Sequence, residues 1–532
     1  MKRRDFLLAS SLPWALAGCE KPHLVQGGFV GSAFERGHLL RVPQLQRPPS
    51  KSIRTRVLIA GGGVAGLAAA RALRLRGMND FALLELEDSA GGNSRAGVVN
   101  GIDCPLGAHY LPAPMATEDS HVRDLLEELG LLQRIAGRWQ YDERALCHSP
   151  QERLFINGQW QDGLLPLHEV DTQTLADYQT FARLVSAAST AAAFKVPVVN
   201  VPVAQYQRAL DAMTFESWLD QQQLTSAPLR WYLDYCCRDD YGAGLKVVSA
   251  WAGIHYFASR HGFSSPGSDE PHEGEAGVLT WPQGNGWLTQ KLAAPLGERL
   301  RTGQVVTRIT TGKHRIEVDA LDVASGQLVR WQADRCIVAL PLFVAASVVD
   351  NPPPALVQAA RSARYAPWLV ANVHINAALH DRPGAAPSWD NVFYSADRTE
   401  PTEGLGYVDA RHQGLERVPG ATVLTHYRAF GVQPGRRKHL YEQPWSYWRD
   451  TVLNEMSLAH PDLPAKTTRI DIMRYGHAMS VPVPGVRSSA ALNALQQPIT
   501  THPRLRFAHS DLSGYSVFEE AFTHGHMQAI SV

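Results

Sequence analysis

Three glycines near residue 60 have the spacing of a phosphate-binding loop. Gly61, Gly63 and Gly66 form a G-x-G-x-x-G pattern, and the apolar run 57–60 before them predicts a buried parallel strand. In this pattern the first glycine permits a tight turn, the second lets the backbone approach a pyrophosphate, and the third allows a helix to pack closely on a strand. We therefore expect a dinucleotide to bind at this loop.

A helix, a second strand and an acid follow the loop in the order that such a site requires. Val64 and Ala65 begin a stretch of strong helix formers that ends at Gly77. The apolar run FALLE then ends in Glu85, about 20 residues past the loop, where a carboxylate can accept hydrogen bonds from a ribose. This order of elements predicts an α/β fold with a Rossmann-like domain.

The segment after the second strand resembles the flavin amine oxidase superfamily. In LLELEDSAGGNSR an acid is followed by the pair Gly91 and Gly92. The resemblance implies that Glu85 binds the ribose of FAD and that the glycine pair passes close to the phosphates and the flavin. The family has an arginine directly after the pair, whereas this chain has Asn93 there and Arg95 two positions on. Whether Arg95 takes over that role stays open.

The same resemblance continues, in order, along nearly the whole chain after residue 55. PLGAHYLPAP resembles the Gly-Ala turn beside the isoalloxazine ring, which implies that Gly107 and Ala108 lie near the flavin. GQVVTRIT places Val306 where the backbone of family members meets the adenine. RLRFAHSDLSGYSVFEEAFTHGHMQAI resembles the closing FAD motif, a strand followed by a helix that begins near Phe518.

The closing motif departs from the family pattern at one place. Family members have a glycine and then an acid after FA, but this chain has His509, Ser510 and Asp511, so either Ser510 or Asp511 is expected to contact the ribityl chain. The helix beginning near Phe518 would direct N–H groups at the flavin and stabilise the negative charge of its reduced form. No cysteine near this motif could form a thioether, so we expect the FAD to be non-covalent.

Three side chains are candidates for contact with the substrate. His109 directly follows the Gly-Ala turn and could act as a base or a substrate ligand. Tyr515, in SGYS, and Tyr475, in RYGHAMS, resemble residues that border the pocket in relatives. Flavin oxidation of an amine needs the donor C–H held over N5, water excluded, and an apolar aromatic pocket that disfavours the substrate cation.

Three functions are compatible with these residues. The resemblance favours oxidation of an amine by hydride transfer to flavin N5. The alternatives are a C–C dehydrogenase or isomerase resembling carotenoid desaturases, and a non-catalytic flavin-binding periplasmic lipoprotein. Many amine oxidases have a lysine near the position of Trp368, but no lysine occurs between Lys313 and Lys438. The charged segment CCRDDYG (236–242) is expected to be a structural ion-pair network.

The resemblance also sets the expected domain boundaries. A discontinuous FAD-binding domain would contain three segments, and an inserted α+β substrate domain would contain the two blocks between them. The first block favours helices, and the second has strand-like runs such as LVANVHINAAL and ATVLTHYRAF. The expected segments are 54–115, 276–345 and 465–532 for FAD, and 116–275 and 346–464 for the substrate.

The first 19 residues resemble an export signal with a lipid attachment site. KRRDFLL resembles the twin-arginine signal, with Arg3 and Arg4 as the pair, and LAGC resembles the bacterial lipobox, which would lipidate Cys19. The apolar run 6–17 is too short to span a bilayer. We expect export by the Tat machinery to the periplasm or extracytoplasmic face, a membrane anchor at Cys19, and a linker over 20–53.

The composition argues against other classes of partner. Lys plus Arg total 51 and Asp plus Glu total 51 in 532 residues, so no nucleic acid is expected to bind. The six cysteines include no CxxC pair and no Cys/His cluster with metal-ligand spacing, so no metal is expected. The adjacent Cys236 and Cys237 are expected to be two buried small side chains.

Overall fold

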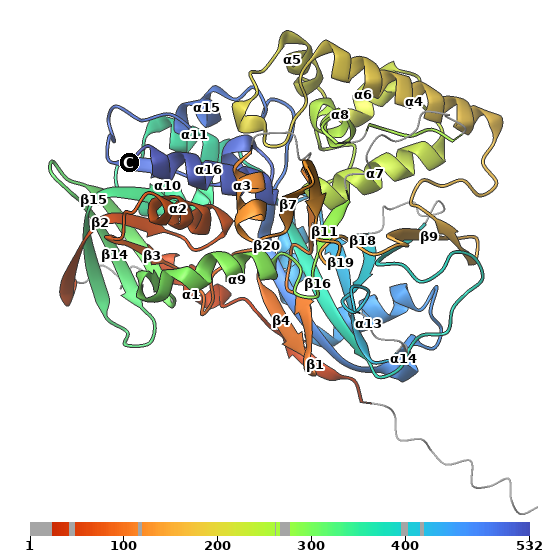
Figure 1. Cartoon of the computed structure of the whole chain (residues 1–532), viewed down its shortest axis with the longest axis horizontal. Coiled ribbons are helices and arrows are strands. Elements are labelled where there is room, and N and C mark those ends of the chain that lie inside the picture. Colours follow the sequence, from red (N-terminus) through yellow and green to blue (C-terminus); the bar gives the residue numbers. More distant parts are fainter. Residues whose placement is uncertain are drawn as a thin grey trace, which may run out of the picture.

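Two β-sheets, each covered by helices on both faces, form the two halves of the computed structural model of this chain (Figure 1). Arg3, Arg4 and Cys19, on which the export and anchoring predictions depend, lie outside the described residues. Within those residues no helix is both long and apolar enough to cross a membrane. The structure describes residues 24–41, 48–114, 120–260, 262–266, 277–394, 403–414 and 420–532.

The first sheet is the predicted Rossmann-like sheet. It has seven strands in the order β12-β3-β2-β15-β14-β13, with β21 paired to β15. The pairs β2–β3, β2–β15 and β15–β21 are parallel, and their apolar runs are buried because helices cover both faces. The strands are β2 (Lys51–Ala60), β3 (Phe81–Leu84), β12 (Leu300–Arg301), β13 (Gln304–Thr311), β14 (Ile316–Asp322), β15 (Leu328–Val338) and β21 (Leu505–Phe507).

Helices pack on both faces of the first sheet. α2 (Val64–Leu75), α9 (Gly286–Ala293) and α16 (Phe518–Ile530) pack on one face, and α10 (Leu342–Val348), α11 (Pro354–Ser362) and α15 (Ala490–Leu495) pack on the other. α16 approaches α2 closely because residue 525 is a glycine. A Cβ atom on Gly525 would lie 2.0 Å from the carbonyl oxygen of Ala65. α16 begins at Phe518, as the closing motif predicted.

The second sheet forms the half of the molecule in which the substrate domain was expected. It has eight strands in the order β1-β20-β16-β19-β18-β17-β9-β10. The side chains of β16 alternate between its faces, with Trp368 in one apolar core and Leu369 in the other. The strands are β1 (Gln26–Phe29), β9 (Glu152–Ile156), β10 (Gln159–Asp162), β16 (Tyr365–Ile375), β17 (Asp390–Phe393), β18 (Gly404–Asp409), β19 (Thr422–Ala429) and β20 (Thr467–Ser480).

Helices cover both faces of the second sheet as well (Figure 1). A group from the first predicted block lies on one face: α4 (Thr172–Ala191), α5 (Gln205–Asp211), α6 (Phe215–Gln221), α7 (Ala227–Tyr241) and α8 (Ala250–Ala258). Another group lies on the opposite face: α12 (Arg436–Glu442), α13 (Trp445–Met456) and α14 (Leu463–Lys466). The helical first block and the strand-rich second block were both predicted.

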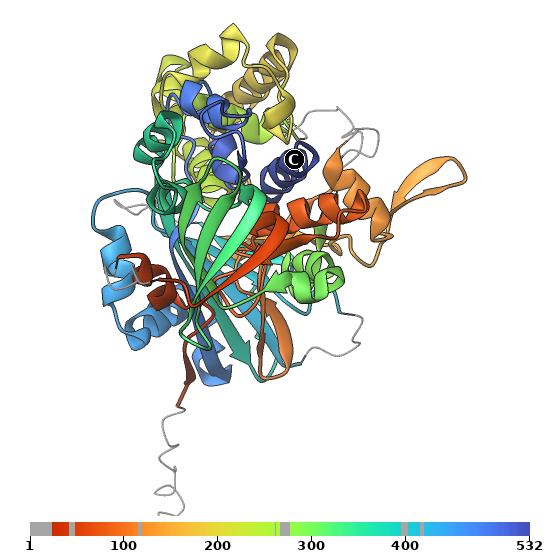
Figure 2. The same ribbon diagram turned by 90° about the vertical axis from the view of Figure 1, so that its left-hand side faces the viewer.

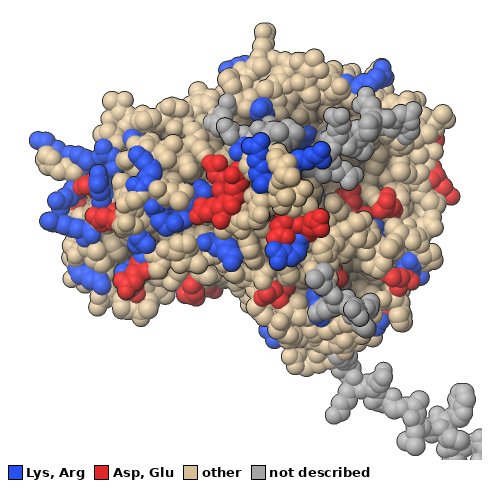
Figure 3. Space-filling view, viewed as in Figure 1, with Lys and Arg blue, Asp and Glu red and all other residues tan. Residues whose placement is uncertain are grey.

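Three two-stranded ribbons lie outside the two large sheets. They are β4 (Ala96–Val99) with β5 (Ile102–Pro105), β6 (Tyr110–Pro112) with β11 (Val278–Thr280), and β7 (Leu132–Ile135) with β8 (Arg138–Tyr141). The β7–β8 hairpin projects away from the body (Figure 2). On the face in Figure 3 acidic and basic side chains are interspersed, with more Lys and Arg toward the end that holds β14 and β15.

The expected linker over 20–53 is wrong for most of its length. Residues 24–41, which we call the N-terminal strap, contain β1 and α1 (Phe34–His38). β1 pairs in parallel with β20, and Gly27 makes this possible because a Cβ atom there would lie 1.9 Å from the oxygen of Ile470. The strap also reaches the first half, where Arg36 donates to the oxygen of Leu86 at 2.9 Å.

Three expected domain boundaries also need correction. β20 belongs to the second sheet, so the last FAD segment does not begin at 465. α3 (His121–Glu128) contributes Val122 and Leu125 to the core beneath the first sheet, although 116–275 was assigned to the substrate domain. α10 and α11 cover the first sheet, so the second substrate block begins after them rather than at 346.

Candidate active site

The glycine loop has the geometry that its spacing predicted. Gly61 has φ +105°, and a Cβ atom on it would lie 2.3 Å from the oxygen of Ala339. A Cβ atom on Gly66 would lie 1.9 Å from the oxygen of Gly61, so α2 can rest on the loop only with glycine there. Both positions therefore exclude any side chain.

The loop and the glycine pair form a backbone cradle at the start of α2. The N–H of Gly91 donates to the oxygen of Gly62 at 2.8 Å, and Gly63 and Gly91 form an isolated parallel bridge. A Cβ atom on Gly92 would lie 3.2 Å from the Cα of Gly63. The first-turn N–H groups of α2, from Val64, Ala65 and Gly66, lack helical partners and suit an anionic diphosphate.

Glu85 is fixed beside this cradle. Its carboxylate accepts hydrogen bonds from the N–H of Gly62 at 2.7 Å and from the N–H of Glu87 at 2.8 Å. The backbone N–H of Gln304 donates to the backbone carbonyl oxygen of Glu85 at 2.8 Å. This bond brings the start of β13, and with it Val306, to the same edge of the sheet. This arrangement fits a ribose and an adenine in the positions that the resemblance implies.

Arg95 lies against the glycine pair. It is buried, its Nε donates to the oxygen of Gly92 at 3.2 Å, and it lies 3.7 Å from a carboxylate oxygen of Glu87. Asn93 instead donates to the oxygen of Ala478 at 2.5 Å and ties this turn to β20. A guanidinium is thus present beside the cradle despite the shift in sequence.

The Gly-Ala turn closes over the same segment. Ala108 donates to the oxygen of Asn93 at 2.9 Å, and a Cβ atom on Gly107 would lie 2.1 Å from that oxygen. At the closing motif, Oδ2 of Asp511 accepts from the N–H of Leu342 at 3.0 Å and from the Tyr365 hydroxyl at 2.5 Å, whereas its buried Oδ1 has no hydrogen-bond partner among the described residues. Both Ser510 and Asp511 therefore stay as candidates for the ribityl contact.

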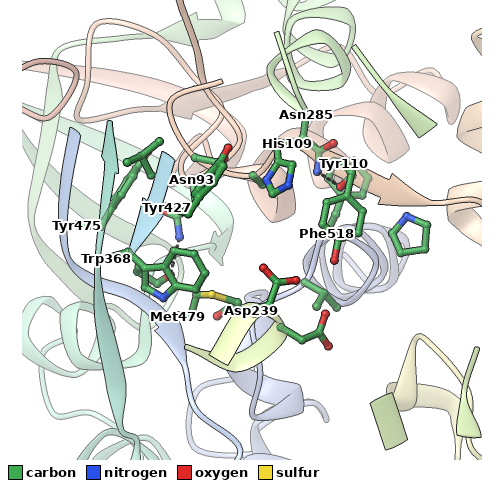
Figure 4. A pocket seen from close by; sticks show the side chains of 18 of the residues that line it. Asn93, His109, Tyr110, Asp239, Asn285, Trp368, Tyr427, Tyr475, Met479 and Phe518 are labelled. Carbon is green, nitrogen blue, oxygen red and sulfur yellow. Dashed lines mark hydrogen bonds between the residues drawn. The ribbon is translucent and has the colours of Figure 1, made fainter. Parts of the chain in front are cut away.

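A cavity of about 150 Å³ opens beside the Gly-Ala turn (Figure 4). We call it the central cavity. Aromatic side chains from both halves and smaller apolar residues line it, and four charged side chains also reach it. Its lining residues are Asn93, Gly107, Ala108, His109, Tyr110, Pro112, Asp239, Asp240, Arg260, Asn285, Trp368, Val370, Tyr427, Tyr475, Ala478, Met479, Ser516, Val517, Phe518 and Glu519.

His109 lies in the aromatic part of this wall. Its ring stacks on Tyr427 with centroids 4.6 Å apart and also contacts Tyr110 and Trp389. Burial lowers the pKa of His109 to about 3. The imidazole is therefore neutral near pH 7 and a weak base, so of its two predicted roles the geometry favours that of a hydrogen-bonding ligand.

The two predicted tyrosines lie in different places in the structure. Tyr475 lines the central cavity, and its hydroxyl donates to the oxygen of Leu106 at 2.9 Å. Tyr515 is only 1% exposed and is not at the cavity, so its expected place in the pocket wall is wrong. Its hydroxyl donates to Glu520 at 2.8 Å and lies 3.2 Å from His255, in a buried polar network.

The charged side chains that line the cavity were not predicted from the sequence. In the segment CCRDDYG, Arg238 does form the expected structural pair, with Asp234 at 2.8 Å, and both cysteines are free and buried. Asp239, however, projects into the cavity between Met479 and Phe518 (Figure 4). Glu519 was not singled out, although it follows the predicted helix start directly and is buried at the cavity wall.

Burial perturbs both of these acids. It raises the pKa of Asp239 to about 7, and the charge of Asp240 adds to that shift. It also raises the pKa of Glu519 to about 7. Since an ordinary aspartate titrates near pKa 3.9, the folded protein holds the Asp239 proton more tightly than the unfolded chain does. Stability is therefore lost as the pH rises from about 4 to about 7.

Replacement of Asp239 by asparagine should remove this part of the pH dependence. Between pH 5 and pH 7.5 we expect the Tm of Asp239→Asn to fall by about 2 °C less than that of the wild type, measured by calorimetry. Asp450→Asn, which removes an exposed aspartate on α13, should follow the wild type. Equal pH dependence of all three proteins would contradict the raised pKa of the half-buried Asp239.

Comparison with known proteins identifies relatives of this fold. The family model described as flavin-containing amine oxidoreductase matches residues 64–532. Putrescine oxidase bound to putrescine has 17% identity and a TM-score of 0.63, covering 90% of this chain and 99% of that one. Cyclohexylamine oxidase from Brevibacterium oxydans has 16% identity and a TM-score of 0.63, covering 91% and 98%.

A third solved structure has a different printed activity. A fatty acid isomerase from P. acnes has 15% identity and a TM-score of 0.62, covering 90% of this chain and 98% of that one. No curated protein matches the sequence. At these identities the likeness of the structures concerns the fold alone.

Proposed function

Because the chain belongs to the flavin-containing amine oxidoreductase family, and is thus an FAD-dependent oxidoreductase, we propose that it oxidises an amine. When bound, FAD supplies the acceptor of a hydride at N5. The observation that carries the proposal is the pair of carboxylates, Asp239 and Glu519, in a cavity whose wall is otherwise mainly aromatic and apolar. Buried carboxylates favour a cationic ligand over a neutral or anionic one.

The residues of the cavity have separate tasks in this proposal. The aromatic wall around Trp368, Tyr427 and Tyr475 excludes water and disfavours the protonated form of the amine that reacts. Neutral His109 can exchange hydrogen bonds with the substrate without adding positive charge. Binding in one orientation supplies the positional part of catalysis.

A C–C dehydrogenase or isomerase is the alternative within the fold. Solved structures with oxidase and isomerase activities resemble this chain about equally, with TM-scores of 0.63 and 0.62. A long apolar substrate would leave Asp239 and Glu519 without a partner inside the cavity, which is costly when they are ionised. The carboxylates therefore favour the amine.

Anaerobic reduction of the purified protein tests the proposal. We expect at least one aliphatic amine to bleach the flavin absorbance, and hydrogen peroxide release in air would identify oxygen as an acceptor. Bleaching by unsaturated lipids or by no donor except a quinol, with every amine inert, would refute amine oxidation.

We also propose that the protein is exported by the Tat machinery and anchored by a lipid on Cys19. The support is the sequence of the first 19 residues and the construction of the FAD site from segments near residues 61, 91, 306 and 510. Such a site forms only when the whole chain has folded, which suits a route that carries folded proteins.

A further inference from the structure

The central cavity is lined by more acidic than basic side chains. Arg260 is the one cation among its lining residues, and it already donates to both carboxylate oxygens of Asp240, at 3.0 and 3.2 Å. Arg260 is thus hydrogen-bonded to Asp240, although its charge also acts on Asp239 and Glu519. The carboxylates of Asp239 and Glu519 have no hydrogen bond or ion pair with another side chain in the part of the chain that the structure describes.

These two acids, which lack a direct side-chain partner, enter the cavity from different directions. Asp239 lies in the last turn of α7 and Glu519 in the first turn of α16. Glu519 is 8% exposed, and that exposed part faces the cavity. Two separately held carboxylates of this kind can surround a charged group more completely than one, and each stays costly to ionise while the cavity is empty.

These carboxylates do not suit the nitrogen that reacts. The reacting amine must be neutral when its C–H bond is broken, and an adjacent carboxylate would hold its proton in place. A carboxylate instead stabilises a group that stays protonated throughout turnover. A substrate carboxylate, as in an amino acid, would meet two acids and a single arginine that already has a partner.

We propose that Asp239 and Glu519 are specificity-determining residues that bind a second cationic group, so that the preferred substrate is a diamine or polyamine and not an amino acid. This inference rests on the proposed amine oxidation.

Three compounds of equal length test the proposal on the FAD-loaded protein. They are n-hexylamine, 1,6-diaminohexane and 6-aminohexanoate, which end in a neutral, a cationic and an anionic group; four- and eight-carbon sets cover other spacings. Binding is followed by perturbation of the flavin spectrum under anaerobic conditions, and turnover by the rate of bleaching. For the best chain length we expect the diamine to bind at least 10-fold more tightly than the monoamine, and the amino acid most weakly.

Variants assign the effect to the two residues. Asp239→Asn and Glu519→Gln should each lower the ratio of diamine affinity to monoamine affinity about 10-fold or more. Asp450→Asn removes an exposed charge elsewhere and should keep the wild-type preference. FAD content and the visible spectrum of each variant establish that its cofactor site has formed, and the second variant serves if the first does not load FAD.

The outcomes separate this inference from the proposed function. If no amine bleaches the flavin, amine oxidation fails, but preferential binding of the diamine would still support the roles of Asp239 and Glu519. If amines bleach the flavin while the monoamine or the amino acid is preferred at every chain length, the inference is overturned and amine oxidation stands. A diamine preference that both variants retain would also overturn it.

Discussion

Replacing Gly66 with alanine should weaken FAD binding about 100-fold. The new Cβ atom would lie 1.9 Å from the oxygen of Gly61, whereas real contacts of this kind are longer than 3.0 Å. The start of α2 would have to move away from the loop by about 1 Å or more. Because the contacted atom belongs to the backbone, no side-chain rotation can relieve the overlap, and overpacking of this kind costs about 3 kcal/mol.

The prediction is checked by FAD content after purification and by the Kd for FAD added back to the apoprotein. Gly37→Ala is a matched control, because a Cβ atom at that position has no atom within 4 Å. The control should bind FAD as the wild type does. A Gly66→Ala protein that keeps one tightly bound FAD per chain would show that α2 does not rest on the loop as described.

Replacing Arg3 and Arg4 together with lysine should stop export and leave FAD-loaded protein in the cytoplasm. The positive charge of the segment is preserved, so only recognition of the arginine pair is lost. The expected result is at least a 10-fold fall in the exported fraction, measured by cell fractionation and immunoblotting. Flavin absorbance of the retained material would show that it had folded before export.

A second pair of substitutions serves as the control for this experiment. Arg54→Lys and Arg56→Lys change two exposed arginines in β2 outside the signal. Export of this variant should be normal. Unimpeded export of the Arg3→Lys, Arg4→Lys protein would rule out the twin-arginine route, and release of the exported protein after Cys19→Ser would report on the lipid anchor.

The FAD half could be predicted from the sequence because its signals are local. Gly61, Gly66 and Glu85 lie within one strand–loop–helix–strand unit, and each residue type is required by a close backbone approach or by a buried hydrogen bond. Their spacing alone therefore fixes much of their geometry. The family resemblance then predicted which more distant segments belong to the FAD site, including the helix that begins at Phe518.

The charged part of the cavity could not be predicted in this way. Asp239 comes from α7, Arg260 from the turn after α8 and Glu519 from α16, and they line one cavity only because the helices over the second sheet pack beside α16. Their separations in sequence carry no periodic signal. A buried acid among aromatic residues is recognisable only once its neighbours are known.

Tyr515 and the N-terminal strap illustrate two other limits. Gly514 adopts φ +86° directly before Tyr515, whose ring lies in the core, whereas Val517 and Phe518 line the cavity. The strand QGGF has little intrinsic preference for extended structure, because two of its residues are glycines. It becomes a strand by pairing with β20, which is a tertiary contact.

The strap restricts how an anchored molecule could be oriented. Under the proposed lipidation, residues 20–23 alone would separate Cys19 from the strap, a distance of at most about 18 Å when extended. The strap is held to the second sheet by β1 and to the first half by Arg36. Such a short tether, on a segment fixed to both halves, would keep the enzyme close to the bilayer and let it tilt only as one body. The enzyme would then meet only substrate dissolved in the thin layer of water next to the membrane.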